Sequence, residues 1–154
     1  YDEKGEYYFV GSGGGGGGGY GIILKEDLNL SPLYILALLN SRLLDFYLQN
    51  ISSPFRHGYY AYNKQYVEQL PIKLLDLSNP SEKAKHDELA SIADKMLNLN
   101  KEIQKISENT DRWYALKKAI EKTDKAIDER VYELYGLSER DINIVVGGET
   151  CQKI

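Results

Sequence analysis

Cysteine is almost absent from this chain, which has one cysteine, Cys151, and two histidines, His57 and His86, among 154 residues. An internal disulfide is therefore excluded, as is typical of proteins from a reducing cytoplasm. A structural zinc site needs three or four cysteine or histidine ligands, so this class of metal site is excluded as well. We expect Cys151, which lies close to the end of the chain, to be an inert thiol.

Long apolar runs are also lacking. The longest, Leu33–Leu39, makes about two turns of helix, whereas a membrane span needs about 20 apolar residues. No basic, apolar and small-residue regions follow one another as in a signal peptide. We therefore expect a cytoplasmic protein without membrane contact. Because the sequence begins with Tyr1, we also expect it to be a piece of a longer protein.

Motifs for catalysis are missing from the sequence. It has no Pro-Pro pair, although enzymes that methylate an adenine amine grip the flipped base with a polar-Pro-Pro-aromatic motif. The acids Asp27, Asp45 and Glu68 are scattered, unlike the clustered acids of metal-dependent nucleases. We therefore expect no catalytic centre, metal or cofactor within these residues.

The glycine run Gly13–Gly19 suggests a phosphate-binding loop, but the Lys–Ser/Thr pair that such a loop requires does not follow it. Tyr20–Ile23 follows instead and is typical of a strand. We interpret the glycines as a mobile connection between two strands. Close approach of this glycine backbone to DNA is the alternative interpretation.

The net charge of −4 conceals a local excess of positive charge. No acid occurs between Asp45 and Glu68, whereas Arg56, His57 and Lys64 lie in this window. Arginine can form two hydrogen bonds with guanine, and Asn or Gln with adenine; Lys, Ser and Tyr suit phosphates. The candidate DNA-binding residues are therefore Ser52, Ser53, Arg56, His57, Tyr59, Tyr60, Tyr62, Asn63 and Lys64.

The tyrosines of this window also have a structural interpretation. Their alternation predicts a strand over Tyr59–Tyr66, with half-buried rings and hydroxyls in water. In that case the DNA-facing part contracts to Ser52–Tyr59, centred on Arg56, with Lys64 nearby. Arg56 is the strongest single candidate because it has no acid near it in sequence.

Residues 1–77 predict short mixed elements and, with the helices that follow, an α+β fold. Strands are expected at Tyr7–Val10 and Ile22–Leu24. Ser31 is a predicted N-cap, with Pro32 in the first helical position, for a buried helix that runs through Leu33–Leu48. Leu70–Leu74 is expected to be extended, because Pro71 disfavours helix in the residue before it.

Residues 82–145 predict helices, after a turn-forming boundary at Ser78–Ser81. One apolar stripe with heptad spacing predicts a helix from about Glu82 to Ser107, and a second stripe ends before Gly136, a typical residue after a helix. An antiparallel helical hairpin with a coiled-coil seam is the simplest assembly, and a single long helix is the alternative. Residues 146–154 are expected to be a flexible tail.

Three segments carry a resemblance to a known family. The run SPLYILALLNSRLLDFY from Ser31 to Tyr47 resembles the Asn-Ser helix of TaqI-like C-terminal specificity domains, which belong to adenine-specific DNA methyltransferases of type IIG restriction–modification systems. The segments ISS, GYYAY and YVEQLPI within Ile51–Ile72 resemble the part that follows, and VYELYGLS at Val131–Ser138 resembles the family's closing element. Type I specificity subunits are similar, and the resemblance covers about Tyr7 to Val145.

The resemblance implies both an architecture and a function. Residues 1–77 would be the C-terminal part of a DNA target-recognition domain of mixed α/β structure, and residues 82–145 a helical spacer. The partners would be double-stranded DNA and a catalytic methyltransferase domain of the same parent chain. That domain would use S-adenosylmethionine to methylate adenine N6, and many complete enzymes of the family also cleave DNA.

A different class of function is the alternative. The helical pair over residues 82–135 would then be a protein–protein interaction module, which binds another subunit or forms a homodimer. A third hypothesis, a complete enzyme, lacks any supporting motif.

Overall fold

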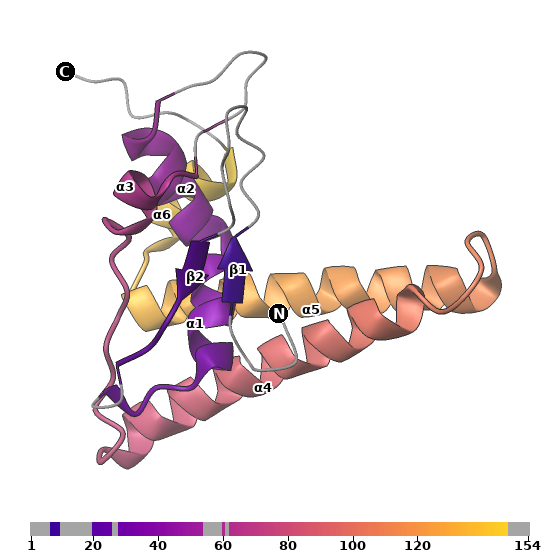
Figure 1. The fold of residues 1–154 in the computed structure, drawn as a ribbon, viewed down its shortest axis with the longest axis horizontal. Coiled ribbons are helices and arrows are strands. Elements are labelled where there is room, and N and C mark those ends of the chain that lie inside the picture. The colour runs from indigo at the N-terminus through magenta and orange to yellow at the C-terminus, as the bar shows by residue number, and fades with distance from the viewer. Residues whose placement is uncertain (1–6, 10–19, 26–27, 54–59, 61, 148–154) are drawn as a thin grey trace.

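The computed structural model describes residues 7–9, 20–25, 28–53, 60 and 62–147. Among them are six helices and two strands (Figure 1): β1 (Tyr7–Phe9), β2 (Tyr20–Ile22), α1 (Pro32–Leu39), α2 (Arg42–Ile51), α3 (Lys64–Val67), α4 (Pro80–Ile103), α5 (Asp111–Tyr135) and α6 (Glu139–Gly147). The helices α4 and α5 form a long hairpin that projects from the rest. The shorter helices α1, α2, α3 and α6 gather at its base.

The predicted α+β class is wrong, because helices account for most of the described residues. The only sheet among them is a ribbon of two antiparallel strands with three residues each, in which Tyr7 pairs with Ile22 and Phe9 with Tyr20. Tyr7–Val10 is therefore nearly matched by β1, whereas β2 begins two residues before the predicted strand Ile22–Leu24. The glycine run between the strands and residues 148–154 of the predicted tail lie outside the described residues. The first two residues of that tail, 146 and 147, belong instead to the end of α6.

The helix predicted over Leu33–Leu48 is broken into α1 and α2 at Asn40 and Ser41. The Asn40 side chain donates a hydrogen bond to the carbonyl of Leu36. Ser41 is fully buried, and its hydroxyl donates to the carbonyl of Leu38 while accepting from the N–H of Leu44. Short polar side chains that bond the nearby backbone compete with helical hydrogen bonds in this way, so α1 ends and α2 receives its own N-cap.

A strand over Tyr59–Tyr66 is also wrong in the part that the structure describes. Lys64–Val67 forms the short helix α3, which follows Asn63. The N–H groups of Tyr66 and Val67 both donate to the carbonyl of Asn63. These local hydrogen bonds take up backbone groups that a strand would have offered to a neighbour.

The sequence prediction of the long helices is close to the structure. Asn79 caps α4, and Thr110 caps α5 by accepting a hydrogen bond from the N–H of Trp113. Gly136, with a left-handed φ of 70°, ends α5 as predicted. Of the two alternatives for residues 82–135, the hairpin is therefore the one found.

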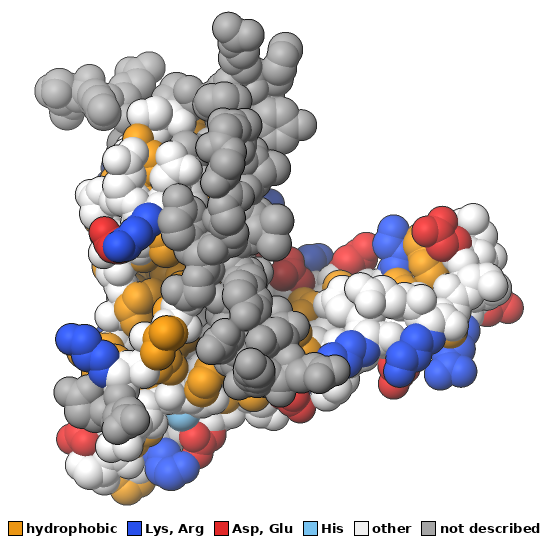
Figure 2. All heavy atoms as spheres, in the orientation of Figure 1, with side chains coloured by type: hydrophobic (Ala, Val, Ile, Leu, Met, Phe, Trp, Pro, Cys, Tyr) orange, Lys and Arg blue, Asp and Glu red, His pale blue; other side chains and the backbone are white. Residues whose placement is uncertain are grey.

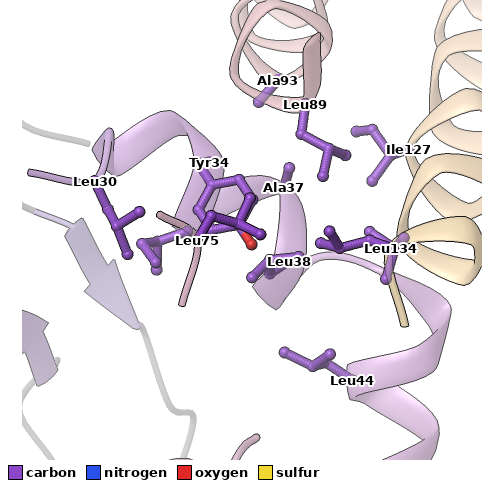
Figure 3. Packing of buried hydrophobic residues seen from close by; sticks show 12 residues of the cluster. Leu30, Tyr34, Ala37, Leu38, Leu44, Leu75, Leu89, Ala93, Ile127 and Leu134 are labelled. Carbon is purple, nitrogen blue, oxygen red and sulfur yellow. The ribbon is translucent and has the colours of Figure 1, made fainter. Parts of the chain in front are cut away.

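One hydrophobic core joins both compositional regions. Tyr34 and Leu38 of α1 are fully buried, and they lie against Leu89 of α4 and Ile127 of α5 (Figure 3). Fully burying a side chain of this size stabilises the fold by about 1.5–3 kcal/mol. Helix α1 is thus packed across the base of the hairpin, while the distal part of the hairpin extends beyond it (Figure 1). The domain boundary at Ser78–Ser81 stays a prediction.

The segment between α3 and α4 runs along this core without helix or strand. The N–H of Ile72 donates to the carbonyl of Leu70 at 2.9 Å, so the chain turns locally at Pro71, and an extended Leu70–Leu74 stays a prediction. The Tyr34 hydroxyl donates to the carbonyl of Lys73 at 2.8 Å. The Tyr135 hydroxyl donates to the carbonyl of Pro71 at 2.6 Å and accepts from the N–H of Lys73 at 3.1 Å. Two tyrosines on different helices therefore replace the ladder of hydrogen bonds that a sheet would have provided.

Candidate functional site

The candidate DNA-contacting residues lie between the end of α2 and the beginning of α3. Arg56, His57 and Tyr59 lie outside the described residues. Ser52 and Ser53 follow α2, and Asn63 and Lys64 lie at the beginning of α3. The structure therefore shows how the two ends of the candidate segment are held.

A pair of hydroxyl groups joins the two ends of this segment. Ser53 Oγ lies 2.9 Å from the Tyr66 hydroxyl oxygen, within hydrogen-bond distance. This contact connects the residue that follows the α2 C-cap to α3. The hydrogen bond to Ser53 lowers the pKa of the Tyr66 hydroxyl, because it stabilises the phenolate form. Both side chains lie on the surface, and this contact closes the base of the segment across 13 positions of sequence.

A second contact connects the end of the candidate segment near α3 to helix α2. The Tyr62 hydroxyl donates a hydrogen bond to the carboxylate of Asp45 in the first turn of α2. Gln49 donates to the other oxygen of this carboxylate at 2.8 Å. Burial, followed by the hydrogen bond to Asp45, raises the pKa of Tyr62 to about 12. Tyr62 therefore keeps its proton and its bond to α2 over the ordinary pH range.

This position gives Tyr62 a structural role that the sequence did not indicate. Its hydroxyl is engaged by a carboxylate, which repels a DNA phosphate rather than attracting it. Asp45 is the acid at the beginning of the acid-free window, but the sequence contained no signal that its partner would lie 17 positions away. Tyr60, also a candidate, is partly buried.

Ser52 likewise differs from the other candidates. It is 8% exposed, and its hydroxyl has no hydrogen-bond partner among the described residues. Ser53, Asn63 and Lys64 are exposed and accessible to a ligand. Lys64 forms an ion pair at 3.3 Å with Glu68, the C-cap residue of α3. Such an exposed pair contributes about 0–1 kcal/mol, so it leaves the lysine available to a phosphate.

No metal site accompanies these residues in the described ranges. There, no three His, Cys, Asp or Glu side chains come together as metal ligands. None of the helices in the part that the structure describes has the length and apolar character to cross a membrane.

The family comparison covers this segment and the helices on which it is built. Residues 18–72 match the model of the TaqI-like C-terminal specificity domain. The match covers just over a third of the chain and includes α1, α2, α3 and the extended residues up to Ile72. It confirms, for these residues, the resemblance found in the Asn-Ser helix. Specificity domains of this kind recognise DNA sequence in restriction–modification systems.

No curated protein and no solved structure matches the chain. The residues that match the specificity-domain model include the candidate site. Its described part consists of the exposed side chains Ser53, Asn63 and Lys64, and Arg56 lies between them in sequence.

Proposed function

We propose that this chain is the DNA-recognising part of a restriction–modification enzyme that methylates adenine at N6 and also cleaves DNA. The observation that carries the proposal is the match of residues 18–72 to the specificity domain. The matched residues include the whole candidate segment from Ser52 to Lys64.

The division of labour in this proposal follows from the residues that are present. Methyl transfer is assigned to a catalytic domain of the parent protein, because the chain has no base-gripping Pro-Pro motif. S-adenosylmethionine, when bound there, supplies the methyl group. The residues of this chain contribute the position of the enzyme on DNA and the choice of site.

The candidate segment suits this task because both its ends are fixed to α2 and α3. The Ser53–Tyr66 and Tyr62–Asp45 contacts close its base, and a closed base reduces the conformational freedom that is lost when a loop binds. Arg56 is assigned to a base edge in the major groove and Lys64 to a phosphate.

The test is a double substitution, Arg56→Ala with Lys64→Ala, in the 154-residue chain. Binding to duplex DNA is measured by fluorescence anisotropy from low to moderate salt. We expect weaker binding and a salt dependence whose logarithmic slope falls by about 1 for each phosphate contact that is lost. The matched control, Lys105→Ala with Arg112→Ala, removes the same charge next to the turn of the hairpin and leaves binding unchanged.

Equal binding by the wild type and the Arg56/Lys64 variant, with an unchanged circular dichroism spectrum, would place the DNA contact elsewhere. A loss of affinity in the hairpin control as large as in the test variant would mean that only total charge matters.

A second candidate function is protein–protein interaction through the hairpin of α4 and α5, and the shape of the hairpin favours it. The distal part of α4 and α5 projects away from the shorter helices (Figure 1), and Tyr114 beside the turn is 56% exposed. Leu89 and Ile127 are almost fully buried against α1 at the base of the hairpin, whereas Leu99 and Leu116 in the distal part are only partly buried, so an interaction would use the distal part. Sedimentation velocity separates the candidates, because a stable dimer without DNA affinity would favour the hairpin.

A further inference from the structure

The apolar surface of the hairpin continues beyond the hydrophobic core at its base. On α4, Leu89 and Ala93 are buried in the core, and among the described residues of this helix Met96 is the last that packs against it. On α5, Ile127 is buried in the same core. The distal part of the hairpin, residues 97–120, carries further apolar side chains that are only partly buried: Leu97, Leu99, Ile103, Trp113, Leu116 and Ile120.

One face of α5 shows how this apolar surface is arranged. Trp113, Ile120 and Ile127 are spaced by seven residues, so they lie on one face of the helix. Ile127 packs in the core, whereas Trp113 and Ile120 extend the same face outward along the hairpin. Figure 2 shows hydrophobic side chains near the end of the hairpin, beside charged groups of both signs. Two helices alone cover only part of each other's apolar stripe, so the distal part has room for further helices.

Two exposed charges of opposite sign adjoin this apolar face. Lys117 and Glu121 lie one turn apart on α5, but no ion pair within 4.0 Å includes either of them in the part of the chain that the structure describes. Lys117 instead lies over the ring of Trp113, with its Nζ 4.5 Å from the centroid. A lysine that precedes a glutamate by four residues is the less favourable order for a pair within one helix. Both charges are therefore available to another chain.

We propose that the distal part of the hairpin binds the same part of a second copy of this chain, with the two α5 helices antiparallel. Lys117 and Glu121 lie two residues on either side of Ala119. A two-fold axis level with Ala119 therefore brings Lys117 of each copy opposite Glu121 of the other copy. The interface is isologous, so this match of charges is made twice. The partly buried apolar residues then cover one another between four helices.

A second copy fits this surface better than other partners do. A symmetric interface must be complementary to itself, and the equal spacing of one cation and one anion about Ala119 meets that requirement. A DNA backbone would be repelled by Glu121 and would leave the apolar side chains exposed. The proposal rests on the second candidate function, interaction through the hairpin, and names its partner. It does not depend on DNA recognition by the candidate segment.

The experiment is sedimentation equilibrium of the 154-residue chain without DNA, which measures the dissociation constant of the dimer. We expect a reversible equilibrium between monomer and dimer for the wild type. Lys117→Glu and Glu121→Lys each bring like charges together across the two-fold axis, so each should weaken the dimer about 10-fold or more. The matched controls, Lys122→Glu and Glu129→Lys, make the same changes of charge at exposed positions away from this face. They should leave the dissociation constant unchanged.

A mixture of the two reversed chains tests the antiparallel register directly. The Lys117→Glu chain is negative at both positions and the Glu121→Lys chain is positive at both, so each should bind the other although neither binds itself well. We expect the mixture to associate about as tightly as the wild type. Energy transfer between dyes attached to Cys151, the single cysteine, detects the mixed dimer. Circular dichroism checks that every variant keeps its helices.

Two outcomes would overturn the proposal, and they differ in what else they remove. A chain that stays monomeric at every concentration would exclude self-association through the hairpin altogether. A dimer that neither reversal weakens, or reversed chains that fail to associate when mixed, would exclude the pairing of Lys117 with Glu121. Neither outcome bears on DNA recognition, because DNA is absent from these measurements.

Discussion

The backbone N–H of Ser31 donates a hydrogen bond to Nε2 of His86 at 2.9 Å, across 55 positions of sequence. Ser31 is the N-cap of α1, and His86 lies in the first part of α4. Because Nε2 accepts this bond, the ring proton must lie on Nδ1, which is 2.8 Å from a carboxylate oxygen of Asp87. The His86 ring also packs against Tyr34, with centroids 5.0 Å apart. A neutral histidine thus joins the beginning of α1 to α4.

This contact makes His86 a structural residue, and substitution should show it. His86→Leu leaves the N–H of Ser31 without an acceptor, which should lower the free energy of unfolding by about 1–3 kcal/mol. His86→Gln is the matched variant, because its side-chain oxygen can accept the same bond, and it should lose less. Urea unfolding measures both. Equal stability of the leucine variant and the wild type would mean that water satisfies the N–H of Ser31 instead.

The sequence predicted the structural features that depend on residues close together in the chain, such as the caps and the ends of helices. The stripes of α4 and α5, the caps Ser31 and Thr110 and the terminating residue Gly136 all depend on side chains within one or two turns. The break between α1 and α2 did not follow from hydrophobicity, because apolar residues continue on both sides of it. The buried Ser41 and its bonds to Leu38 and Leu44 decide that break.

Partners distant in sequence account for what could not be predicted at the candidate site. The alternation of tyrosines suggested a strand, but Tyr62 is bound to Asp45 and Tyr66 to Ser53. Neither pair is visible in spacing, because each depends on how α3 returns to α2. The exposure of Ser53 and Lys64 agrees with their selection as candidates, although their contact with DNA stays a prediction.

Tyr34 offers a test of how the extended segment before α4 is held. Its hydroxyl is the donor to the carbonyl of Lys73, and burial raises its pKa, so it stays protonated. Tyr34→Phe should lower the free energy of unfolding by about 1 kcal/mol and speed hydrogen exchange in the residues around Lys73. The control is Tyr114→Phe, which removes an exposed hydroxyl bonded to Asn109. If the free energy of unfolding falls equally in both variants, the hydrogen bond from Tyr34 to Lys73 stabilises the fold no more than an exposed hydrogen bond does.

Asp128 gives a prediction about pH. Burial raises the pKa of its carboxyl above the ordinary 3.8. A carboxyl whose pKa is higher in the folded chain than in the unfolded chain stabilises folding when protonated. Its contribution is therefore present below pH 3.8 and is lost as the pH rises through the raised pKa. Asp128→Asn keeps the acceptor for the N–H of Arg42 and should remove this part of the pH dependence.

At neutral pH, Asp128→Asn should be at least as stable as the wild type, since it no longer buries a charge. Asp128→Ala should be less stable than Asp128→Asn by about 1 kcal/mol, because the N–H of Arg42 loses its acceptor. Thermal unfolding at several pH values measures both variants, with Glu129→Gln as an exposed control on the same helix. An asparagine variant less stable than the alanine variant would contradict this account of the site.

Substitution of Tyr62 tests whether its hydroxyl stabilises the fold or contacts DNA. Tyr62→Phe removes the donor to Asp45 but keeps the ring, so the free energy of unfolding should fall by about 1 kcal/mol. Because the pKa of Tyr62 is about 12, the loss should be the same throughout the neutral range and should disappear only in strong alkali, where the wild-type hydroxyl ionises beside the carboxylate. Binding to duplex DNA at low salt should change much less than with Arg56→Ala and Lys64→Ala. A large loss of DNA affinity in Tyr62→Phe, with its stability unchanged, would instead make the Tyr62 hydroxyl a DNA contact and the bond to Asp45 a feature of the DNA-free chain only.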